Sequence, residues 1–190
     1  MGRGRRLLCG AGISTSALAF GGYNGSASVN NTELWNGSSW AEQNNLSVAR
    51  HELGGTGATN GAAIAAGGYS PAASSTTAGS EEWTANAPVG AWATGGTLNT
   101  ARANSGSAAA DNTAALVSGG NPNLAITESY NGSSWTEVND LNTARDYLAG
   151  GGTETSALAF GGEPVSPAVQ AYTESWNGSS WTEVSDMNVG

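Results

Sequence analysis

One arginine and one glutamate recur at corresponding places in each quarter of the 190-residue chain, and their side chains could pair. The arginines are Arg5, Arg50, Arg102 and Arg145, and the glutamates are Glu33, Glu81, Glu128 and Glu174. A guanidinium and a carboxylate form charge-assisted hydrogen bonds. Because every quarter carries both residues, the sequence predicts a structural ring of paired charges that supports the loops. A ring of arginines that binds an anionic group on one face is the alternative.

The other residues that could do chemistry lack partners. His51 is the only histidine, so no second imidazole can share a metal with it, and we interpret it as a loop or surface residue. Cys9 stands inside a predicted strand where the last quarter has Ala149, and we expect a small buried thiol. Without lysine, a Ser-Lys pair is impossible. We therefore predict a protein that is not an enzyme and that uses no metal and no cofactor.

Composition narrows the class of protein and of partner. The net charge of −9 disfavours nucleic acid and membrane insertion. The 29 glycines favour turns and strands over helices. Seven tryptophans argue against disorder, because disordered segments are poor in aromatic residues. These tryptophans need an apolar environment in which to be buried.

Internal repeats indicate where that environment lies. Glycine pairs stand at 21 and 22, 67 and 68, 119 and 120, and 161 and 162. The second aromatic residue of each unit is Trp40, Trp92, Trp135 or Trp181. These spacings predict a single repeat domain over 1–190 with units at approximately 2–46, 47–98, 99–141 and 142–187.

Each unit reads as four short antiparallel strands. In the last unit they are DYLAGGGT, SALAFGG, YTESW and WTEV, with turns at ETS and at the Asn-Gly of NGSS. A four-stranded sheet alone cannot bury both faces, whereas sheets stacked around an axis can. The sequence predicts an all-β propeller of four four-stranded blades. We expect the small residues of ALAFGG on the innermost strands and the tryptophans between blades.

These units resemble the kelch repeats of β-propellers. The matching residues are the pair Gly161 and Gly162, the aromatics Trp176 and Trp181, and Arg145 in the link, with equivalents in the other units. The two aromatics are closer together than the family commonly has them, and the blades are fewer. NGSSWTEVNDLNTAR is also similar to repeats of phage-derived and environmental open reading frames, which implies a virion or cell-surface protein. SYNGSSW is similar to the Asp-box turn of sialidase-like propellers, but it is one residue short.

The connection after each glycine pair varies in length and sequence, as a binding surface does on a constant scaffold. The loop residues that could bind a ligand are Tyr23, Asn24, Tyr69, Asn121, Asn123, Glu163 and Tyr172. Aromatic and amide groups suit sugar rings or protein surfaces. We therefore expect a binding module of fibre or adhesin type that recognises a glycan or a protein. The alternatives are a purely structural virion decoration or assembly protein and a glycan-active propeller enzyme of sialidase type.

The first 22 residues, with basic residues before an apolar stretch, look at first like a signal peptide. Residues 2–22 align with residues 142–162, and both contain SALAFGG. We therefore expect the first strand pair rather than a signal peptide, so an extracellular or virion location depends on composition and resemblance alone. A closed ring of four blades, a fragment of a larger ring, two chains forming eight blades, or a larger viral assembly would all give this pattern.

Overall fold

The computed structural model describes residues 4–85, 90–164 and 170–188, and this part of the chain contains strands and no helix. Sixteen of the strands form four antiparallel sheets of four. Sheet 1 contains β1 (Cys9–Ile13), β2 (Ser16–Phe20), β3 (Thr32–Trp35) and β4 (Trp40–Glu42). Sheet 2 contains β5 (Gly54–Thr59), β6 (Ala62–Ala66), β9 (Ser80–Thr84) and β10 (Ala91–Thr94). Sheet 3 contains β11 (Gly106–Asp111), β12 (Ala114–Ser118), β13 (Thr127–Tyr130) and β14 (Trp135–Val138). Sheet 4 contains β15 (Ala149–Thr153), β16 (Ser156–Phe160), β17 (Thr173–Trp176) and β18 (Trp181–Val184).

Within each sheet the strands pair in chain order, so every connection joins neighbouring strands. The turn between β3 and β4 shows how the repeated NGSS segment fixes the register. Gly37 has a φ of 91°, and the Asn36 side-chain oxygen accepts the backbone N–H groups of Ser38 and Ser39 at 2.9 Å each. Asn131 and Asn177 repeat this turn in sheets 3 and 4. A short hairpin, β7 (Tyr69–Ser70) with β8 (Ser75–Thr76), extends the connection within sheet 2.

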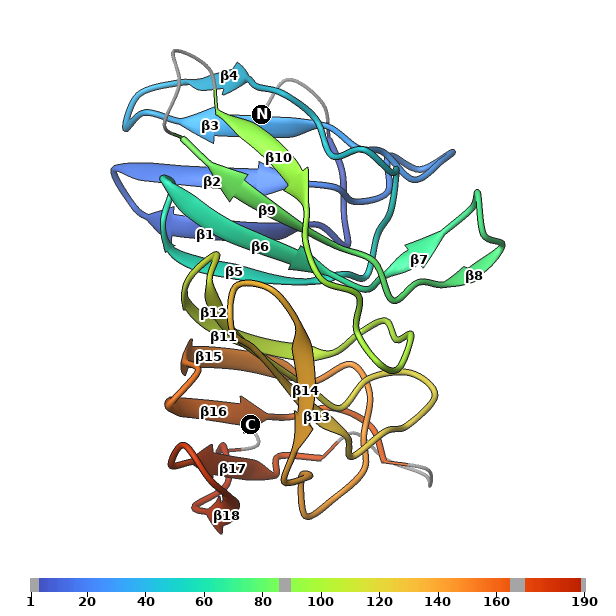
Figure 1. Cartoon of the computed structure of the whole chain (residues 1–190), viewed down its shortest axis with the longest axis vertical. Helices are drawn as coiled ribbons and strands as arrows, with labels where there is room; N and C mark the ends of the chain where they lie inside the picture. The colour runs from blue at the N-terminus through green and yellow to red at the C-terminus, as the bar shows by residue number, and fades with distance from the viewer. Residues whose placement is uncertain (1–3, 86–89, 165–169, 189–190) are drawn as a thin grey trace.

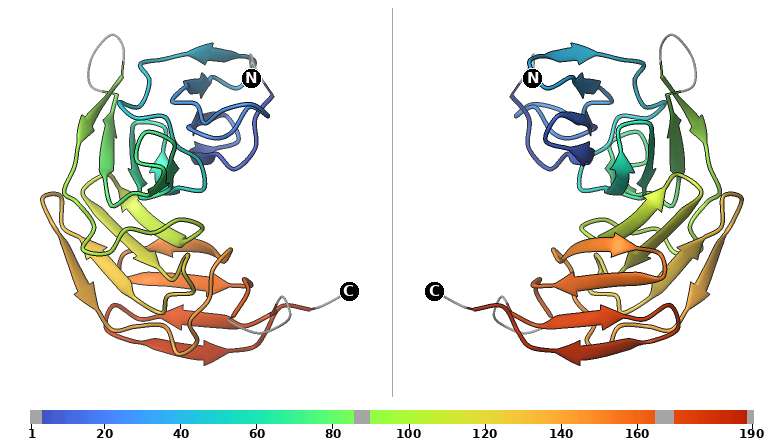
Figure 2. Two further views of the ribbon diagram at one scale, coloured as in Figure 1. Left: turned by 90° about the vertical axis from the view of Figure 1, so that its right-hand side faces the viewer. Right: turned by 90° about the vertical axis from the view of Figure 1, so that its left-hand side faces the viewer.

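The four sheets follow one another along an open arc, with sheet 1 at one end and sheet 4 at the other (Figure 2). Strand β1 packs beside β5, β5 beside β11, and β11 beside β15. The innermost strands are therefore the glycine-rich first strands of the sheets. The expectation that ALAFGG forms the innermost strand is wrong, because that segment forms the second strand, β2 or β16. All-β architecture and four-stranded antiparallel sheets are compatible with the predicted propeller.

The apolar core is divided into three parts, one between each pair of neighbouring sheets. We call the surface by which a sheet contacts the following sheet its forward face, and the surface that contacts the preceding sheet its rear face. Leu18 and Phe20 on the forward face of sheet 1 pack against Ala63, Ala65 and Trp83 on the rear face of sheet 2. The large forward residues thus fill the space left by small rear residues, beside a buried aromatic ring.

The other two parts of the core repeat this arrangement. Between sheets 2 and 3 the cluster includes Ile64, Ala66, Ala115, Val117, Tyr130 and Trp135. Between sheets 3 and 4 it includes Leu116, Ala157, Ala159, Trp176 and Trp181. Each link between sheets adds a leucine, Leu46, Leu98 or Leu141. The tryptophans of sheets 2, 3 and 4 therefore do lie between neighbouring sheets.

The glycine pairs bind each sheet to the next. Gly21 and Gly22 have φ values of 65° and 107°, a region that favours glycine. The N–H of Gly22 donates to the Arg50 carbonyl of the next link at 2.9 Å. A Cβ at Gly21 would lie 2.9 Å from that same carbonyl oxygen. Glycine is therefore required both by the backbone conformation and by the closeness of the next sheet.

Candidate functional site

In each unit the arginine lies in the segment before the sheet and pairs with the glutamate on the third strand of that sheet. The guanidinium of Arg50 lies 2.8 Å from the carboxylate of Glu81, and Arg102 pairs with Glu128. In sheets 1 and 4 the corresponding pairs are Arg5 with Glu33 and Arg145 with Glu174. Burial lowers the pKa of the Arg102 guanidinium, and the Glu128 carboxylate opposes this change.

These pairs hold the links between sheets. Arg102 also donates to the Ile126 carbonyl at 2.7 Å, and the Glu128 carboxylate accepts the backbone N–H of Asn99 at 2.7 Å. The four arginine side chains are at most 2% exposed. Each guanidinium lies against the glutamate of its own unit, and we call these four arginine–glutamate pairs the frame.

A second set of residues, next to this frame, differs from sheet to sheet. The residue after each repeated arginine forms a backbone bridge with the residue after each glycine pair. The bridges are Arg6 with Tyr23, His51 with Tyr69, Ala103 with Asn121, and Asp146 with Glu163. Four of the predicted ligand residues, Tyr23, Tyr69, Asn121 and Glu163, therefore take part in these bridges. The bridges follow the second strands β2, β6, β12 and β16, whose connections to the third strands lie on the right-hand side of Figure 1.

The bridges of sheets 1 and 2 form an aromatic cluster. The His51 ring lies between Tyr23 and Tyr69, with ring centroids 5.4 and 5.3 Å away. Its Nδ1 shares a hydrogen bond with the Ser28 hydroxyl at 2.7 Å. The Arg6 guanidinium lies 5.4 Å from the centre of the Tyr23 ring. His51 is thus a half-buried member of the cluster, in the link between sheets 1 and 2.

The bridges of sheets 3 and 4 are polar and acidic. The Asn121 side-chain amide donates to the Asp146 carboxylate at 3.2 Å. Asp146 is buried, and Glu163 beside it is exposed. The bridges of sheets 1 and 2 therefore carry aromatic rings and a cation, and the bridges of sheets 3 and 4 carry carboxylates and an amide.

A shallow cavity of about 320 Å³ lies next to these four bridges, on the inner side of the arc. Each sheet contributes to it the second residue after its repeated arginine, namely Leu7, Glu52, Asn104 and Tyr147. All four have a positive φ, between 54° and 57°, which is uncommon for residues other than glycine. The same strained turn therefore presents a different side chain in each sheet.

Tyr147 is the most exposed of the large apolar side chains that line this cavity, at 57%. Partial burial and the carboxylates of Glu52, Asp146 and Glu163 raise the pKa of its phenol, and a hydrogen bond with Asn104 opposes them. The phenol therefore stays neutral at neutral pH and keeps its O–H donor.

Cys9 also lines this cavity. Its thiol donates to the Leu53 carbonyl at 2.9 Å, and burial raises its pKa to about 12. A thiol in this state is a poor nucleophile. We use the name variable face for two sets of residues together. The first set is the eight bridge residues, and the second is Leu7, Glu52, Asn104 and Tyr147 at the strained turns.

The other predicted ligand residues lie in different surroundings. Asn24 caps its own turn, accepting the N–H groups of Ser26 and Ala27 at 2.9 Å each. The Asn123 side-chain oxygen is buried without a hydrogen-bond partner. Tyr172 accepts the N–H of Gly161 through its backbone carbonyl. Residues 165–169 of the last variable connection lie outside the described residues.

Eight residues of the variable face were not predicted as site residues from the sequence: Arg6, Leu7, His51, Glu52, Ala103, Asn104, Asp146 and Tyr147. A signal for them was present, because two residues that differ in every unit follow the repeated arginine: RL, HE, AN and DY. Their variation at a constant position marks the variable face as clearly as the loop lengths do.

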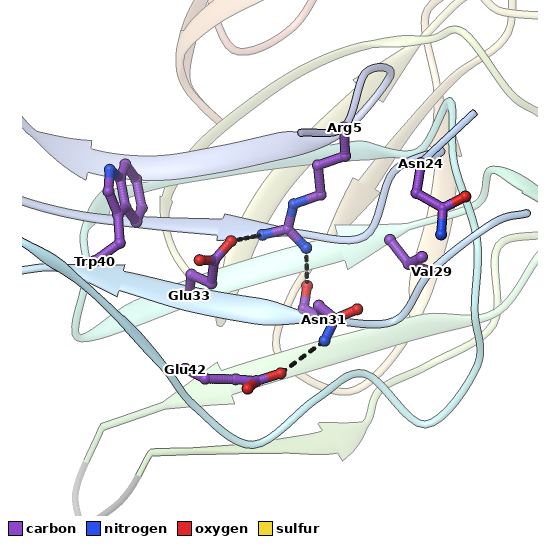
Figure 3. A pocket seen from close by; sticks show the side chains of 7 residues that line it. All are labelled: Arg5, Asn24, Val29, Asn31, Glu33, Trp40 and Glu42. Atoms are coloured by element: carbon purple, nitrogen blue, oxygen red, sulfur yellow. Dashed lines mark hydrogen bonds and ion pairs between the residues drawn. The ribbon is translucent and has the colours of Figure 1, made fainter. Parts of the chain in front are cut away.

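A different cavity, of about 260 Å³, lies on the rear face of sheet 1 (Figure 3). It is lined by Arg5, Asn24, Val29, Asn31, Glu33, Trp40 and Glu42, and we call it the end cavity. Arg5 bonds there to Glu33 and to the Asn31 carbonyl, and the Asn31 amide donates to Glu42. Arg5 and Glu33 in this lining belong to the frame.

Among residues 4–85, 90–164 and 170–188, no group of three or more His, Cys, Asp or Glu side chains is placed to hold a metal ion. The same residues contain no helix that could cross a membrane. No protein-family model matches the chain, and no curated protein matches it either.

Proposed function

We propose that the four sheets are blades of a kelch-like β-propeller and that the protein is a non-enzymatic binding module of a virion or cell surface. Its ligand is a neutral glycan, bound at the variable face. The glycine pairs, the link arginines and the inter-sheet aromatics support the assignment of kelch-like blades, since each has the same structural role from sheet to sheet.

One observation carries the proposal for the variable face. Frame residues such as Arg102 and Glu128 repeat and are buried, whereas the two residues that follow each repeated arginine differ from unit to unit. The first of the two always bridges to the residue after a glycine pair. A purely structural repeat has no need of different side chains at a position whose backbone bridge is constant. Variation on a rigid scaffold is the usual construction of a binding surface.

The chemistry of the cavity favours a sugar. Tyr147 offers an exposed ring, and Glu52 and Asn104 beside it offer a carboxylate and an amide. An apolar surface with a few fixed polar groups suits a ligand with apolar ring faces and many hydroxyls. Asp146 and Glu163 next to the cavity repel acidic sugars, so a neutral glycan fits best.

The test is a glycan array followed by calorimetry with the best neutral glycan. Replacing Tyr147 by alanine is expected to weaken binding by about tenfold or more, the usual effect of removing a central aromatic contact. Ile13→Ala is the matched control, because Ile13 is 62% exposed at the turn between β1 and β2, outside the variable face.

Equal loss of affinity in both variants would contradict the assignment of the site. A blank array with correctly folded protein would favour the structural alternative. Turnover of any glycoside on the array would overturn the proposal that the protein is not an enzyme.

A further inference from the structure

The two ends of the arc carry complementary surfaces. We propose that the forward face of sheet 4 binds the rear face of sheet 1 of a second copy, so that two chains close head to tail into one ring of eight sheets. This inference goes beyond the proposed function and does not depend on the glycan.

The forward face of sheet 4 is apolar and exposed. Leu158 is 43% exposed, whereas Leu18 at the same position of sheet 1 is 1% exposed. Met187 is 43% exposed, whereas Leu46 at the corresponding place after sheet 1 is 1% exposed. Leu18 and Leu46 are buried because sheet 2 covers them. Leu158 and Met187 lie where a fifth sheet would cover them.

The rear face of sheet 1 is also partly exposed, and it carries a pair of aromatic rings. Trp35 and Trp40 are half-buried and pack against each other at 5.5 Å between ring centroids. The corresponding rings in sheet 4, Trp176 and Trp181, are only 3% and 6% exposed. Those two rings are covered by sheet 3, whereas no sheet among the described residues covers the pair in sheet 1.

The contact between sheets 1 and 2 shows how these surfaces would fit. The Trp92 ring of sheet 2 packs edge-on against Phe20 at 4.9 Å, and its indole N–H donates to the Thr32 hydroxyl at 2.9 Å. Sheet 4 carries Phe160 and Thr173 at the positions of Phe20 and Thr32.

Sheet 1 carries Trp40 where sheet 2 has Trp92. The Trp40 ring of one copy can therefore pack on Phe160 of the other copy, and its indole N–H can donate to Thr173. Because residues 16–22 and 156–162 are identical, SALAFGG, the forward face of sheet 4 repeats a surface that already binds such a tryptophan.

The end cavity supplies a second point of fit. On the rear face of sheet 4, Glu174 and Trp181 take the places of Glu33 and Trp40. Asn142 of the preceding link binds there, and its side-chain amide donates to Glu174 at 2.8 Å and to the Trp181 carbonyl at 3.2 Å. Asn188, one residue after Met187, takes the place of Asn142 after sheet 4 and is exposed. In the proposed ring the Asn188 side chain of the second copy therefore lies at the end cavity, beside Trp40.

A second copy suits these surfaces because each chain carries one face of each kind. Two copies then satisfy both contacts at once, and a head-to-tail contact ends in a ring if its geometry closes. The two faces lie at the two ends of the open arc (Figure 2). Each chain has a net charge of −9, so added salt should strengthen the association by screening repulsion.

Light scattering after size exclusion tests the proposal on the 190-residue chain. The expected mass is twice the chain mass of 18.9 kDa. Leu158→Glu on one face and Trp40→Ala on the other should each halve the measured mass. Val48→Glu is the matched control and should leave the mass unchanged, because Val48 is 41% exposed in the link between sheets 1 and 2.

A single-chain mass for the unaltered protein over the whole concentration range would overturn the proposal. So would a dimer that survives both end-face variants, since it would use another surface. Masses that grow beyond two chains would show a head-to-tail contact that does not close, and would overturn the ring. Circular dichroism of each variant separates loss of association from loss of folding.

Discussion

Two identical segments of the chain lie in opposite surroundings. Residues 16–22 and 156–162 both read SALAFGG, and both form a second strand followed by a glycine pair. In sheet 1 this strand is covered by sheet 2, and Leu18 is 1% exposed. In sheet 4 none of the other sheets in the described part of the chain covers it, and Leu158 is 43% exposed.

The difference separates what the sequence of a unit determines from what its neighbour determines. Strand, turn and backbone pairing are the same in the two sheets, because local sequence specifies them. Burial of the forward face is not a local property, since it requires the alanines and the aromatic ring of another sheet. The inner and the end positions of this array should therefore respond differently to the same substitution.

The largest difference is expected at the arginines. Arg102→Met leaves Glu128 as a buried charge without its guanidinium, which costs about 3–5 kcal/mol of unfolding free energy. Arg5→Met should cost at most half as much, because its partner Glu33 is 10% exposed and Glu128 is 0% exposed. Urea unfolding of both variants measures the difference. Equal losses would contradict the distinction between inner and end positions.

Leu18 and Leu158 give the most direct matched pair. Leu18→Ala should lower the unfolding free energy by about 3 kcal/mol, the usual cost of a cavity in a packed core. Leu158→Ala should cost less than about 1 kcal/mol at concentrations where the chain is a monomer, as for other exposed positions. Raising the protein concentration should increase the cost at Leu158 and leave that at Leu18 unchanged, which chemical unfolding at two concentrations can show. A cost at Leu158 that does not depend on concentration would count against the second copy.

A smaller difference is expected at the two threonines. Thr32→Val removes the acceptor of the Trp92 indole N–H and should cost about 1 kcal/mol. Thr173→Val removes no indole contact within the chain, so the monomer should lose less. Thermal unfolding of the two variants under the same conditions compares their losses of stability. A larger loss for Thr173→Val than for Thr32→Val would contradict the expectation.

The fold was predictable from sequence where local signals were strong. The Asn-Gly turns, the glycine pairs and the alternating strands such as YTESW indicated four units of four strands, and the structure contains four such sheets. The placing of SALAFGG on the innermost strand was wrong, because its small residues are needed for packing between sheets rather than at the inner side of the arc. Whether the sheets form a closed propeller depends on contacts beyond the unit, which local patterns do not encode.

The candidate site was predictable only in part. Variable loops indicated Tyr23, Tyr69, Asn121 and Glu163, which the structure brings to one side. Four of the residues that line the cavity beside them have a left-handed backbone conformation, and Tyr147 is one of them. A left-handed conformation is uncommon for tyrosine, so its sequence did not indicate it. Bonds between units help to hold these turns, because the Glu52 N–H donates to the Leu7 carbonyl and the Asn104 N–H to the Glu52 carbonyl.

The head-to-tail fit of the two ends can be tested by a cross-link between chains. In a Cys9→Ala background, one sample carries Glu42→Cys in the end cavity and another carries Asn188→Cys, both at exposed positions. A short bis-maleimide should join the chains when the two samples are mixed, because Asn188 of one copy then meets the end cavity of the other. Each sample alone should give almost no product. No product in the mixture, or equal product in the separate samples, would contradict the account.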